Sequence, residues 1–407
     1  MAAQLAIHGG TPVRTKPFPS WPVYGQPEEQ AVLRALRSGK WGKLDGVEVA
    51  AFERDFARYQ GARHGIAVLN GTVAIQVALM AAGIKPGDEV IVPPYTFLAT
   101  ATAVVTSNAT PVFADIELDT FNIDPKAIEA LITSRTRAII PVHFAGLPAD
   151  MDAIMAIARR HNLVVIEDAA HAHAAEYKGR RAGSIGHMGT FSFQSSKNLT
   201  AGEGGFITTN DPALAEACRE IHNCGRREGH AWYEHFVIAA NFRLSEIQGA
   251  LLNAQLQRLE EQARRRWENG RYLTEQLGQI PGIKPQKIIP ECTRHAFHLY
   301  CFRIDAQELG APRQAFLEAL AAEGIPDFGG YPLPLYKQRV FLDRAFGPFD
   351  GCRGIDYAKT CCPNCEKICY EQGGWLEHRM LLGTREDMDD IVAAFRKVYE
   401  NRSRLQG

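Results

Sequence analysis

The sequence lacks an excess of charge of either sign. Its 407 residues include 45 lysines and arginines and 46 aspartates and glutamates, which leaves a formal net charge of −1. A chain without a basic excess has little electrostatic attraction for nucleic acids or for anionic membrane surfaces. We therefore expect small molecules as its ligands, with no nucleic acid and no membrane as partners.

Long hydrophobic runs are also missing. No stretch of eighteen apolar residues occurs, and the first residues, MAAQLAIHGGTPVR, do not combine a basic segment with a long apolar one. The sequence offers neither a candidate membrane span nor an export signal, and we expect a cytoplasmic protein.

The cysteines do not form the pattern of a disulfide framework. There are nine of them, an odd number, spread along a chain without an export signal, so we expect free thiols. Four lie close together with a spacing that is compatible with zinc or an iron–sulfur cluster: Cys361, Cys362, Cys365 and Cys369. A separated second pair of ligands is missing, since Cys352 is the only other cysteine nearby. We therefore favour free thiols over a metal site.

What the sequence does contain is a repeated alternation of short β-rich runs with helical ones. Helical patterns such as 73–82 and 152–161 lie between the β-rich runs. Seven runs have the composition of buried strands bounded by glycine, proline or polar residues: 65–70, 89–94, 110–115, 138–144, 163–168, 188–194 and 205–210. The alternation predicts an α/β protein with a mostly parallel sheet that is covered on both faces.

The last third of the chain has a different pattern. It contains a long amphipathic helix, a strand, a shorter helix, a loop rich in glycine, proline and tyrosine, and a terminal helix, at 244–272, 298–304, 312–323, 329–336 and 385–399. A chain of 407 residues exceeds what one hydrophobic core usually supports. We predict a large domain over residues 1–265, including an N-terminal arm, and a smaller α+β domain over residues 266–407.

The segment GTFSFQSSKNLTAGEGG (189–205) carries the strongest chemical signal. Lys197 follows a predicted buried strand, stands among Ser, Asn and Thr, and is the only charged residue between His187 and Glu203. Such surroundings lower the pKa of a lysine, which Schiff-base chemistry requires. An ordinary lysine in a solvated loop is the alternative interpretation.

Two further segments place polar residues at predicted strand ends, where ligands bind in α/β sheets. Asp168 ends the run VVIED, and a buried carboxylate there can pair with the nitrogen of a pyridine ring. The tripeptide Asn70-Gly71-Thr72 opens a helix whose free N–H groups can hold a phosphate. For both segments an ordinary helix cap is the alternative.

The remaining candidates rest on weaker signals. Phe97, in PPYTFLATATAV, could cover one face of a flat cofactor, although such phenylalanines more often belong to a core. Asn241 and Arg243 precede the long predicted helix and offer an amide and a guanidinium to a phosphate or carboxylate; a helix cap explains Asn241 nearly as well. We place further substrate contacts in the loop that begins at Tyr331 and near 226–227 and 375–379.

Taken in order, these segments resemble the DegT/StrS family of sugar and cyclitol aminotransferases, which has the aspartate aminotransferase-like fold type I. The resemblance extends from LAIHGGTPVR through NGTVAIQVAL, PYTFLATATAV, VIEDAAHAHAA, FSFQSSKNLTAGEGG and NFRLSEIQGALL to WLEHRMLLG. It implies pyridoxal 5′-phosphate as the cofactor and a homodimer with shared active sites.

The resemblance also assigns roles to individual positions. Lys197 matches the family's Schiff-base lysine, Asp168 the partner of the pyridinium nitrogen, and His171 a residue near the ring hydroxyl. Phe97 matches the aromatic residue that stacks on the ring, and Asn241 a residue that the neighbouring subunit contributes to the phosphate. Four positions match residues that hold the phosphate or its surroundings: Gly71, Thr72, Ser192 and Gln194. One departure, alanine at position 174 where glycine is common, lies outside these roles.

Several motifs look similar to one branch of the family, that of aminohydroxybenzoate synthases and inosose aminotransferases: AAHAHAA, AGEGG, CGR (224–226) and CPNC…WLEHR. The CPN tripeptide is common in that branch, which again favours free thiols over a metal site. We therefore predict ping-pong transfer of an amino group from glutamate or glutamine to a keto sugar or keto cyclitol, with Lys197 as the proton shuttle and Asp168 as the anchor of the ring.

Other functions remain as alternatives. One is a sugar dehydratase or an aminohydroxybenzoate synthase-like enzyme of the same family, although family members that dehydrate sugars carry histidine in place of Lys197. A nucleotide-binding oxidoreductase would need a G-x-G-x-x-G turn after an early strand, which the sequence lacks. A binding protein that kept the fold without turnover is disfavoured by the presence of both Lys197 and Asp168.

Overall fold

In the computed structural model, which describes residues 3–352 and 354–405, the seven predicted strands form one sheet. Its order is β1-β9-β8-β5-β4-β2-β3; the pairs from β8 to β3 are parallel, and β9 runs antiparallel to both β1 and β8. The strands are β1 (His64–Val68), β2 (Glu89–Val92), β3 (Thr110–Phe113), β4 (Thr136–Ile139), β5 (Val164–Asp168), β8 (Met188–Ser192) and β9 (Gly205–Thr209). The predicted α/β class with a mostly parallel sheet is confirmed.

Both faces of this sheet are buried, which explains why its strands are apolar throughout. Val90 and Val92 of β2 pack with α3 and α4, whereas Ile91 between them packs in a separate core with α5 and α6. Alternate residues of a strand face opposite sides, so a continuous apolar run is what a doubly covered strand requires. The covering helices are α2 (Glu48–Tyr59), α3 (Gly71–Ala81), α4 (Ala99–Thr106), α5 (Pro125–Ala130), α6 (Met151–His161) and α7 (Pro212–His222).

One predicted strand is shorter than expected. The sequence predicts a strand over 138–144, but β4 ends at Ile139. Pro141 has no N–H to donate to a strand ladder, and its carbonyl oxygen instead accepts a hydrogen bond from the Asp168 N–H at 2.8 Å. After Pro141 the chain still runs alongside β5, because Val142 and Asp168 form an isolated parallel bridge in which the His143 N–H donates to the Asp168 carbonyl oxygen at 3.1 Å.

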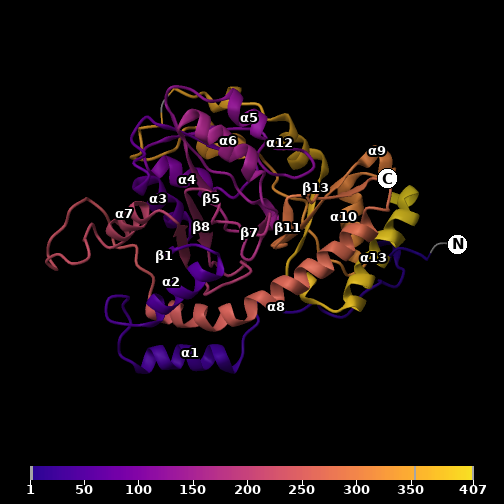
Figure 1. Cartoon of the computed structure of the whole chain (residues 1–407). Coiled ribbons are helices and arrows are strands. Elements are labelled where there is room, and N and C mark those ends of the chain that lie inside the picture. The colour runs from indigo at the N-terminus through magenta and orange to yellow at the C-terminus, as the bar shows by residue number, and fades with distance from the viewer. Residues whose placement is uncertain (1–2, 353, 406–407) are drawn as a thin grey trace.

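Helix α8 (Glu246–Leu277) connects the two ends of the molecule, as Figure 1 shows. Ser245 caps it in a reciprocal arrangement with Gln248. Its first half packs by Leu252 and Leu259 into the core beside β8 and β9, and its end packs by Leu273 into the core of the C-terminal region. Residue 265 thus lies inside a continuous helix that serves both cores, and the division into domains 1–265 and 266–407 stays a prediction.

The C-terminal region contains a second sheet, antiparallel, with β12 (Leu299–Ile304) between β10 (Ile283–Pro285) and β13 (Gly373–Glu377). The N-terminal segment packs on its core through Leu5 and Phe18, and Arg14 Nη1 lies 2.8 Å from Asp387 Oδ1. Both termini lie at this end of the molecule (Figure 1). The helices of the region are α9 (Ala306–Leu309), α10 (Arg313–Ala322), α11 (Arg339–Leu342), α12 (Pro363–Lys367) and α13 (Arg385–Glu400).

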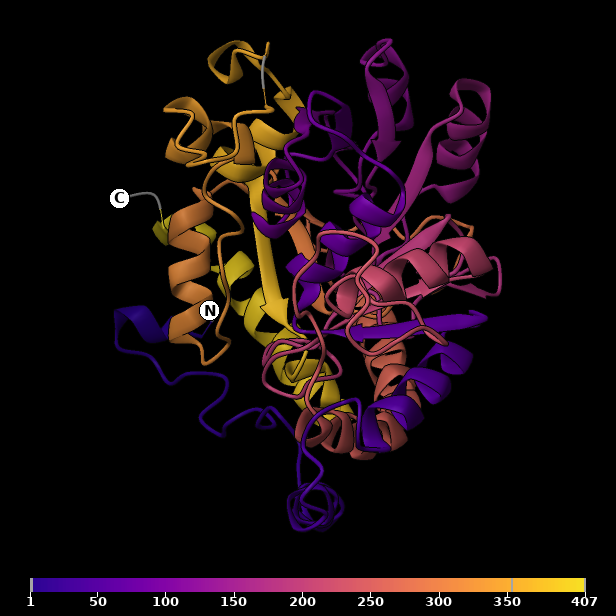
Figure 2. The same ribbon diagram turned by 90° about the vertical axis from the view of Figure 1, so that its left-hand side faces the viewer.

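Two smaller features complete the fold. A minor sheet joins β6 (Glu176–Tyr177) to β7 (Arg180–Arg181) and β11 (Cys292–Arg294). Helix α1 (Gln26–Arg37) packs by its alanines against α8, and Figure 2 shows it end-on, below the body of the molecule. The sequence analysis predicted no element before residue 65, so α1 and α2 are additions from the structure.

The cysteine cluster is part of a hydrophobic core. Cys362, Cys365 and Cys369 are buried in the core of the large sheet, while Cys361 is exposed, and all nine cysteines are free thiols. Within residues 3–352 and 354–405, no three histidine, cysteine or acidic side chains are grouped so that they could hold a metal ion. None of the helices described for the chain combines the length and the apolar character that crossing a membrane demands.

Candidate active site

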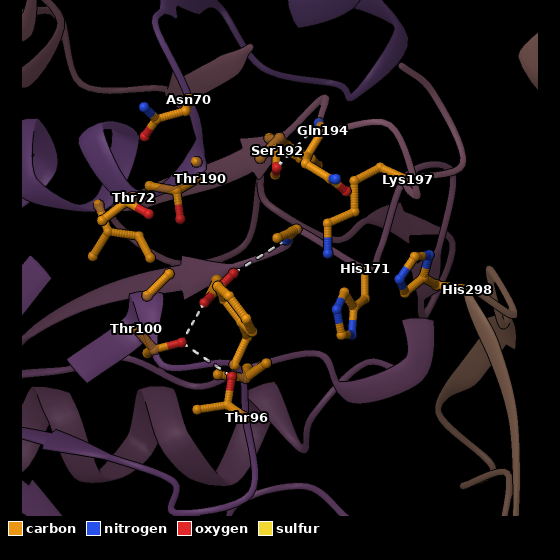
Figure 3. Close-up of a pocket in the computed structure, with 18 of the residues that line it drawn as sticks. Asn70, Thr72, Thr96, Thr100, His171, Thr190, Ser192, Gln194, Lys197 and His298 are labelled. Atoms are coloured by element: carbon orange, nitrogen blue, oxygen red, sulfur yellow. Dashed lines mark hydrogen bonds between the residues drawn. The ribbon is translucent and has the colours of Figure 1, made fainter. Parts of the chain in front are cut away.

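A cavity of about 740 Å³ lies at the carboxyl ends of β5 and β8. It brings together side chains from Asn70 to Trp375, which are far apart in the chain. Figure 3 shows the Lys197 side chain pointing into it, with Asn70 and Thr72 on one side and His171 and His298 on the other. The predicted site residues that line the cavity are Gly71, Thr72, Phe97, Asp168, His171, Ser192, Gln194, Lys197 and Tyr331.

Lys197 reaches the cavity from the turn that follows β8. Its backbone N–H donates to the Gln194 carbonyl oxygen at 2.8 Å, which closes the turn. Burial lowers the pKa of the Lys197 amine to about 8, and the nearby Asp168 carboxylate opposes this shift. A much larger fraction of this amine is neutral near pH 7 than of an ordinary lysine, so it can act as a nucleophile and accept a proton.

Asp168 is the last residue of β5, and two hydrogen bonds orient its carboxylate. Oδ2 accepts from Thr100 Oγ1 at 2.7 Å, and Oδ1 accepts from the Ala170 N–H at 3.2 Å. Burial raises the pKa of the Asp168 carboxyl group, while these two hydrogen bonds oppose that shift. The carboxylate is therefore held at a defined angle in the cavity wall.

Thr100 is a site residue that the sequence analysis missed. Its hydroxyl lies 3.0 Å from that of Thr96, and both residues line the cavity. The signal was present in PPYTFLAT, where the two threonines are four residues apart, a spacing that brings side chains together at the start of a helix. The sequence around Thr100 does not show that its hydroxyl binds Asp168, because the two residues are far apart in the chain.

Glu167, the carboxylate next to Asp168 in the chain, has a structural role. It points away from the cavity and accepts hydrogen bonds from the N–H groups of Gly183, Ile185 and Gly186 at 2.6–2.7 Å, and its Oε2 lies 2.8 Å from His143 Nε2. Burial alone would raise the pKa of Glu167, but these contacts together lower it by more, so the pKa lies below its usual value. Adjacent residues of a strand face opposite sides, so Glu167 stabilises the fold while Asp168 faces the cavity.

The two histidines of AAHAHAA also differ. The Ala145 N–H donates to His171 Nδ1 at 3.3 Å, and burial lowers the pKa of His171 well below its usual value. His171 is therefore neutral, with its proton on Nε2, and offers a hydrogen-bond donor. His173 instead lies buried among the rings of Phe56, Phe191 and Phe193, as expected for a core histidine.

The start of α3 forms the opposite wall and is suited to an anion. Asn70 Oδ1 caps the helix by accepting from the Val73 N–H at 2.9 Å. The first N–H groups of a helix have no partner within it and lie at its positive end. A Cβ atom on Gly71 would lie 2.8 Å from Ser192 Cβ, so only glycine allows this close approach of helix and strand. The capping role of Asn70 and a phosphate-binding role for the segment are compatible.

If the segment holds the phosphate of the expected cofactor, replacing Gly71 with alanine will weaken cofactor binding at least about tenfold, because the added methyl group pushes the helix start away from Ser192. Turnover per loaded site should change far less. Titration of cofactor-free enzyme would measure the dissociation constant. Gly42→Ala is the matched control, since its Cβ meets open space; equal affinities of the two variants would contradict the assignment.

Aromatic side chains surround the mouth of the cavity. Phe97 is 62% exposed and lines the cavity, so the alternative that it belongs to the core is wrong. Its stacking role stays a prediction. Tyr331 and Trp375 meet edge to face with ring centroids 5.2 Å apart and form the wall on the side of the C-terminal sheet.

Asn241 and Arg243 do not reach this chain's own cavity. Asn241 is exposed, and its Oδ1 accepts from the Arg243 N–H at 3.2 Å. Arg243 Nη1 donates to Asn223 Oδ1 at 2.7 Å. A role for either residue in a cofactor or substrate site requires a second subunit, and both assignments stay predictions.

Comparison with known proteins gives consistent matches over nearly the whole chain. The sequence profile of the DegT/DnrJ/EryC1/StrS aminotransferase family matches residues 23–396. The L-glutamine:2-deoxy-scyllo-inosose aminotransferase of Streptoalloteichus tenebrarius is 39% identical over 428 residues, which cover 100% of both chains. The 3-amino-5-hydroxybenzoate synthase of Amycolatopsis mediterranei is 38% identical over 385 residues, 92% of this chain and 97% of that one. A crystal structure of 3-amino-5-hydroxybenzoic acid synthase superposes with a TM-score of 0.86 at 36% identity and covers 96% of this chain and 100% of its own.

Proposed function

The chain belongs to the DegT/DnrJ/EryC1/StrS aminotransferase family, and on that premise we propose that it transfers the amino group of L-glutamine to a keto cyclitol. It is an aminotransferase with the fold type I architecture, and its similarity to inosose aminotransferases and to 3-amino-5-hydroxybenzoate synthase confirms the predicted branch. The observation that carries the proposal is the cavity that the Lys197 amine and the Asp168 carboxylate both line, close enough for the carboxylate to affect the pKa of the amine.

Pyridoxal 5′-phosphate is the cofactor that these residues fit. The cavity pairs an amine of lowered pKa with a fixed carboxylate, and the glycine start of a helix lies across from them. When bound, the cofactor supplies an electron-withdrawing ring that stabilises negative charge on the carbon that loses its proton.

Each residue then has a proposed role. Lys197 holds the cofactor covalently and, when released, carries the proton; its pKa of about 8 suits both tasks near neutral pH. Asp168 would bond to the ring nitrogen, and His171, whose Nδ1 accepts from the Ala145 N–H, would offer its Nε2–H to the ring hydroxyl. The Gly71 and Thr72 N–H groups, together with Ser192 and Gln194, would hold the phosphate, and Phe97 would cover the ring.

The lining of the cavity favours an uncharged polyol as the acceptor. Of the described residues that line it, Lys197 alone has a cationic side chain, because burial keeps His171 and His298 neutral. Glu203 adds a negative charge to the lining. A keto cyclitol needs only hydrogen bonds, whereas the diphosphate of a nucleotide-linked sugar would lack cationic partners in this subunit.

The acceptor preference tests this directly. The enzyme is expected to aminate 2-deoxy-scyllo-inosose with a kcat/KM at least about a hundredfold higher than that for a nucleotide-linked keto sugar, measured with L-glutamine as donor. Glu203→Gln should reduce the ratio of these two kcat/KM values, because it removes a charge that repels the diphosphate. A higher kcat/KM for the nucleotide-linked sugar, or dehydration of the acceptor without amine transfer, would contradict the proposal.

We also propose a homodimer with shared sites. The segment between α7 and α8 projects from the body at the left of Figure 1 and exposes Trp232, Tyr233 and Ile238, the last to 98%. Apolar side chains gathered on a projecting segment are typical of a protein interface. Asn241 lies in this segment and outside its own cavity, which fits a contribution to the phosphate site of a second subunit.

A further inference from the structure

The turn that carries Lys197 is held by side chains from distant parts of the chain. Trp21 Nε1 donates to the Ser195 carbonyl oxygen at 2.9 Å. His378 Nε2 lies 3.0 Å from the Ser196 carbonyl oxygen and must be the donor, since a carbonyl only accepts. The backbone immediately before the lysine is therefore fixed by the N-terminal arm and by the segment after β13.

The residue after the lysine is fixed as well. Asn198 Nδ2 donates to the Ala296 carbonyl oxygen at 2.9 Å, which orients the amide so that its oxygen faces His298. His298 Nδ1, 3.1 Å from that oxygen, is therefore protonated and donates. Lys197 thus stands between two residues that are each hydrogen-bonded to a histidine of the C-terminal region, Ser196 through its backbone carbonyl and Asn198 through its side-chain amide.

Arg266 determines how His378 binds. This arginine, on α8, is fully buried, and its Nη2 lies 3.1 Å from His378 Nδ1. A guanidinium only donates, so Nδ1 must accept and the proton of His378 stays on Nε2, the atom that faces Ser196. Arg266 makes no ion pair with any described carboxylate, and its Nε and Nη1 have no hydrogen-bond partner among residues 3–352 and 354–405. The guanidinium carbon also lies 5.2 Å from the centroid of the Trp21 ring. A buried charge without a carboxylate partner costs stability, which favours a functional reason for its presence.

The imidazole rings form a row from the cavity to Arg266. The ring centroids of His171 and His298 are 4.2 Å apart, and those of His298 and His378 are 5.6 Å apart. Burial lowers the pKa of all three rings well below the usual value, so the row is neutral. It can hold the turn in fixed hydrogen bonds without adding positive charge beside the lysine amine.

We propose that His298 and His378, the latter oriented by Arg266, are positioning residues for amino transfer that keep the backbone of residues 195–198 in place. The inference rests on the proposed function, in which the Lys197 side chain alternates between holding the cofactor and carrying a proton. The backbone must stay fixed while the side chain moves, because a displacement of about 1 Å at a reacting atom can lower the rate on the order of a hundredfold.

Two variants of His378 separate positioning from packing. His378→Leu removes the donor to Ser196 and is expected to lower kcat roughly 10- to 100-fold, with the KM for L-glutamine changed less than about threefold. His378→Gln keeps an N–H donor in the place of Nε2 and should stay within about fivefold of the wild type. His222→Leu is the matched control, since His222 is buried on α7 and donates no bond to the turn; its rate per loaded site should be unchanged.

Hydrogen exchange of the cofactor-free enzyme supplies a readout that needs no turnover. Amides of residues 194–199 should exchange about tenfold faster in His378→Leu than in the wild type, and at the wild-type rate in His378→Gln and His222→Leu. This result is independent of which acceptor the enzyme uses, so a failure of the cyclitol proposal would leave it standing. Equal losses of kcat in the Leu and Gln variants, or unchanged exchange in His378→Leu, would overturn the inference. If His378→Leu does not fold, His298→Leu and His298→Asn give the same comparison, because the asparagine Nδ2 replaces the donor to Asn198.

Discussion

Replacing Lys197 with alanine is expected to abolish transamination, with a fall in kcat of at least about four orders of magnitude, and to remove the visible absorbance of the bound cofactor. The variant loses both the covalent attachment and the proton carrier, two contributions that no other described residue of the cavity can supply. Absorbance spectra and an assay of glutamine-dependent amine formation would measure both effects. Lys126→Ala, at an exposed lysine of α5, is the matched control and should leave both unchanged.

The pH dependence of the rate at which cofactor-free enzyme binds the cofactor is a second test of the role of Lys197. Only the neutral amine attacks the aldehyde of the cofactor, and the neutral fraction rises with pH up to and through the pKa. With a pKa of about 8 for Lys197, the rate of capture by cofactor-free enzyme should reach half of its plateau near pH 8 instead of near pH 10.5. Substantial turnover by Lys197→Ala would contradict the account, as would a capture rate that still rises steeply above pH 9.

Asp168→Asn is the second variant with a large expected effect, a fall in kcat of at least about a hundredfold. Asparagine has the shape of aspartate and can still bond to Thr100, but it has no negative charge to keep a ring nitrogen protonated. Single-turnover rates of the glutamine half-reaction would isolate this effect from binding.

The neighbouring carboxylate provides the control for Asp168. Glu167→Gln replaces an oxygen by an amide nitrogen in a site built from N–H donors, so it should lower the free energy of unfolding. Its rate per loaded site should stay within about threefold of the wild type. If Glu167→Gln lost turnover and Asp168→Asn lost only stability, the assignment of the two residues would be reversed.

The strands of the large sheet and the core of the site could be predicted because their signals are local. A strand buried on both faces is apolar along its whole length, and the polar residue that ends it marks the binding edge; both signals lie within a few residues of sequence. The run VVIED and the segment around Lys197 show this directly. The family resemblance then ordered the segments and led to the correct branch.

What the sequence could not show depends on contacts between distant segments. Thr100 becomes a site residue only because β5 places Asp168 beside α4. His298 becomes one only because the amide oxygen of Asn198 faces its ring. Arg266 lies in a helix rich in Gln, Glu and Arg, where nothing in the pattern distinguishes a buried arginine from its solvated neighbours. The end of β4 at Ile139, earlier than the predicted 138–144, likewise depends on Pro141, whose carbonyl oxygen accepts a hydrogen bond from the Asp168 N–H of β5.

The most direct measurement of the central claim follows the two half-reactions one at a time. Enzyme loaded with pyridoxal 5′-phosphate is mixed with L-glutamine, freed of donor, and then mixed with 2-deoxy-scyllo-inosose while the absorbance of the bound cofactor is recorded. The account predicts that glutamine removes the visible absorbance and that the cyclitol restores it, with about one equivalent of aminocyclitol formed per active site. Absorbance that glutamine leaves unchanged, or that the cyclitol fails to restore although a simple keto acid does, would contradict it.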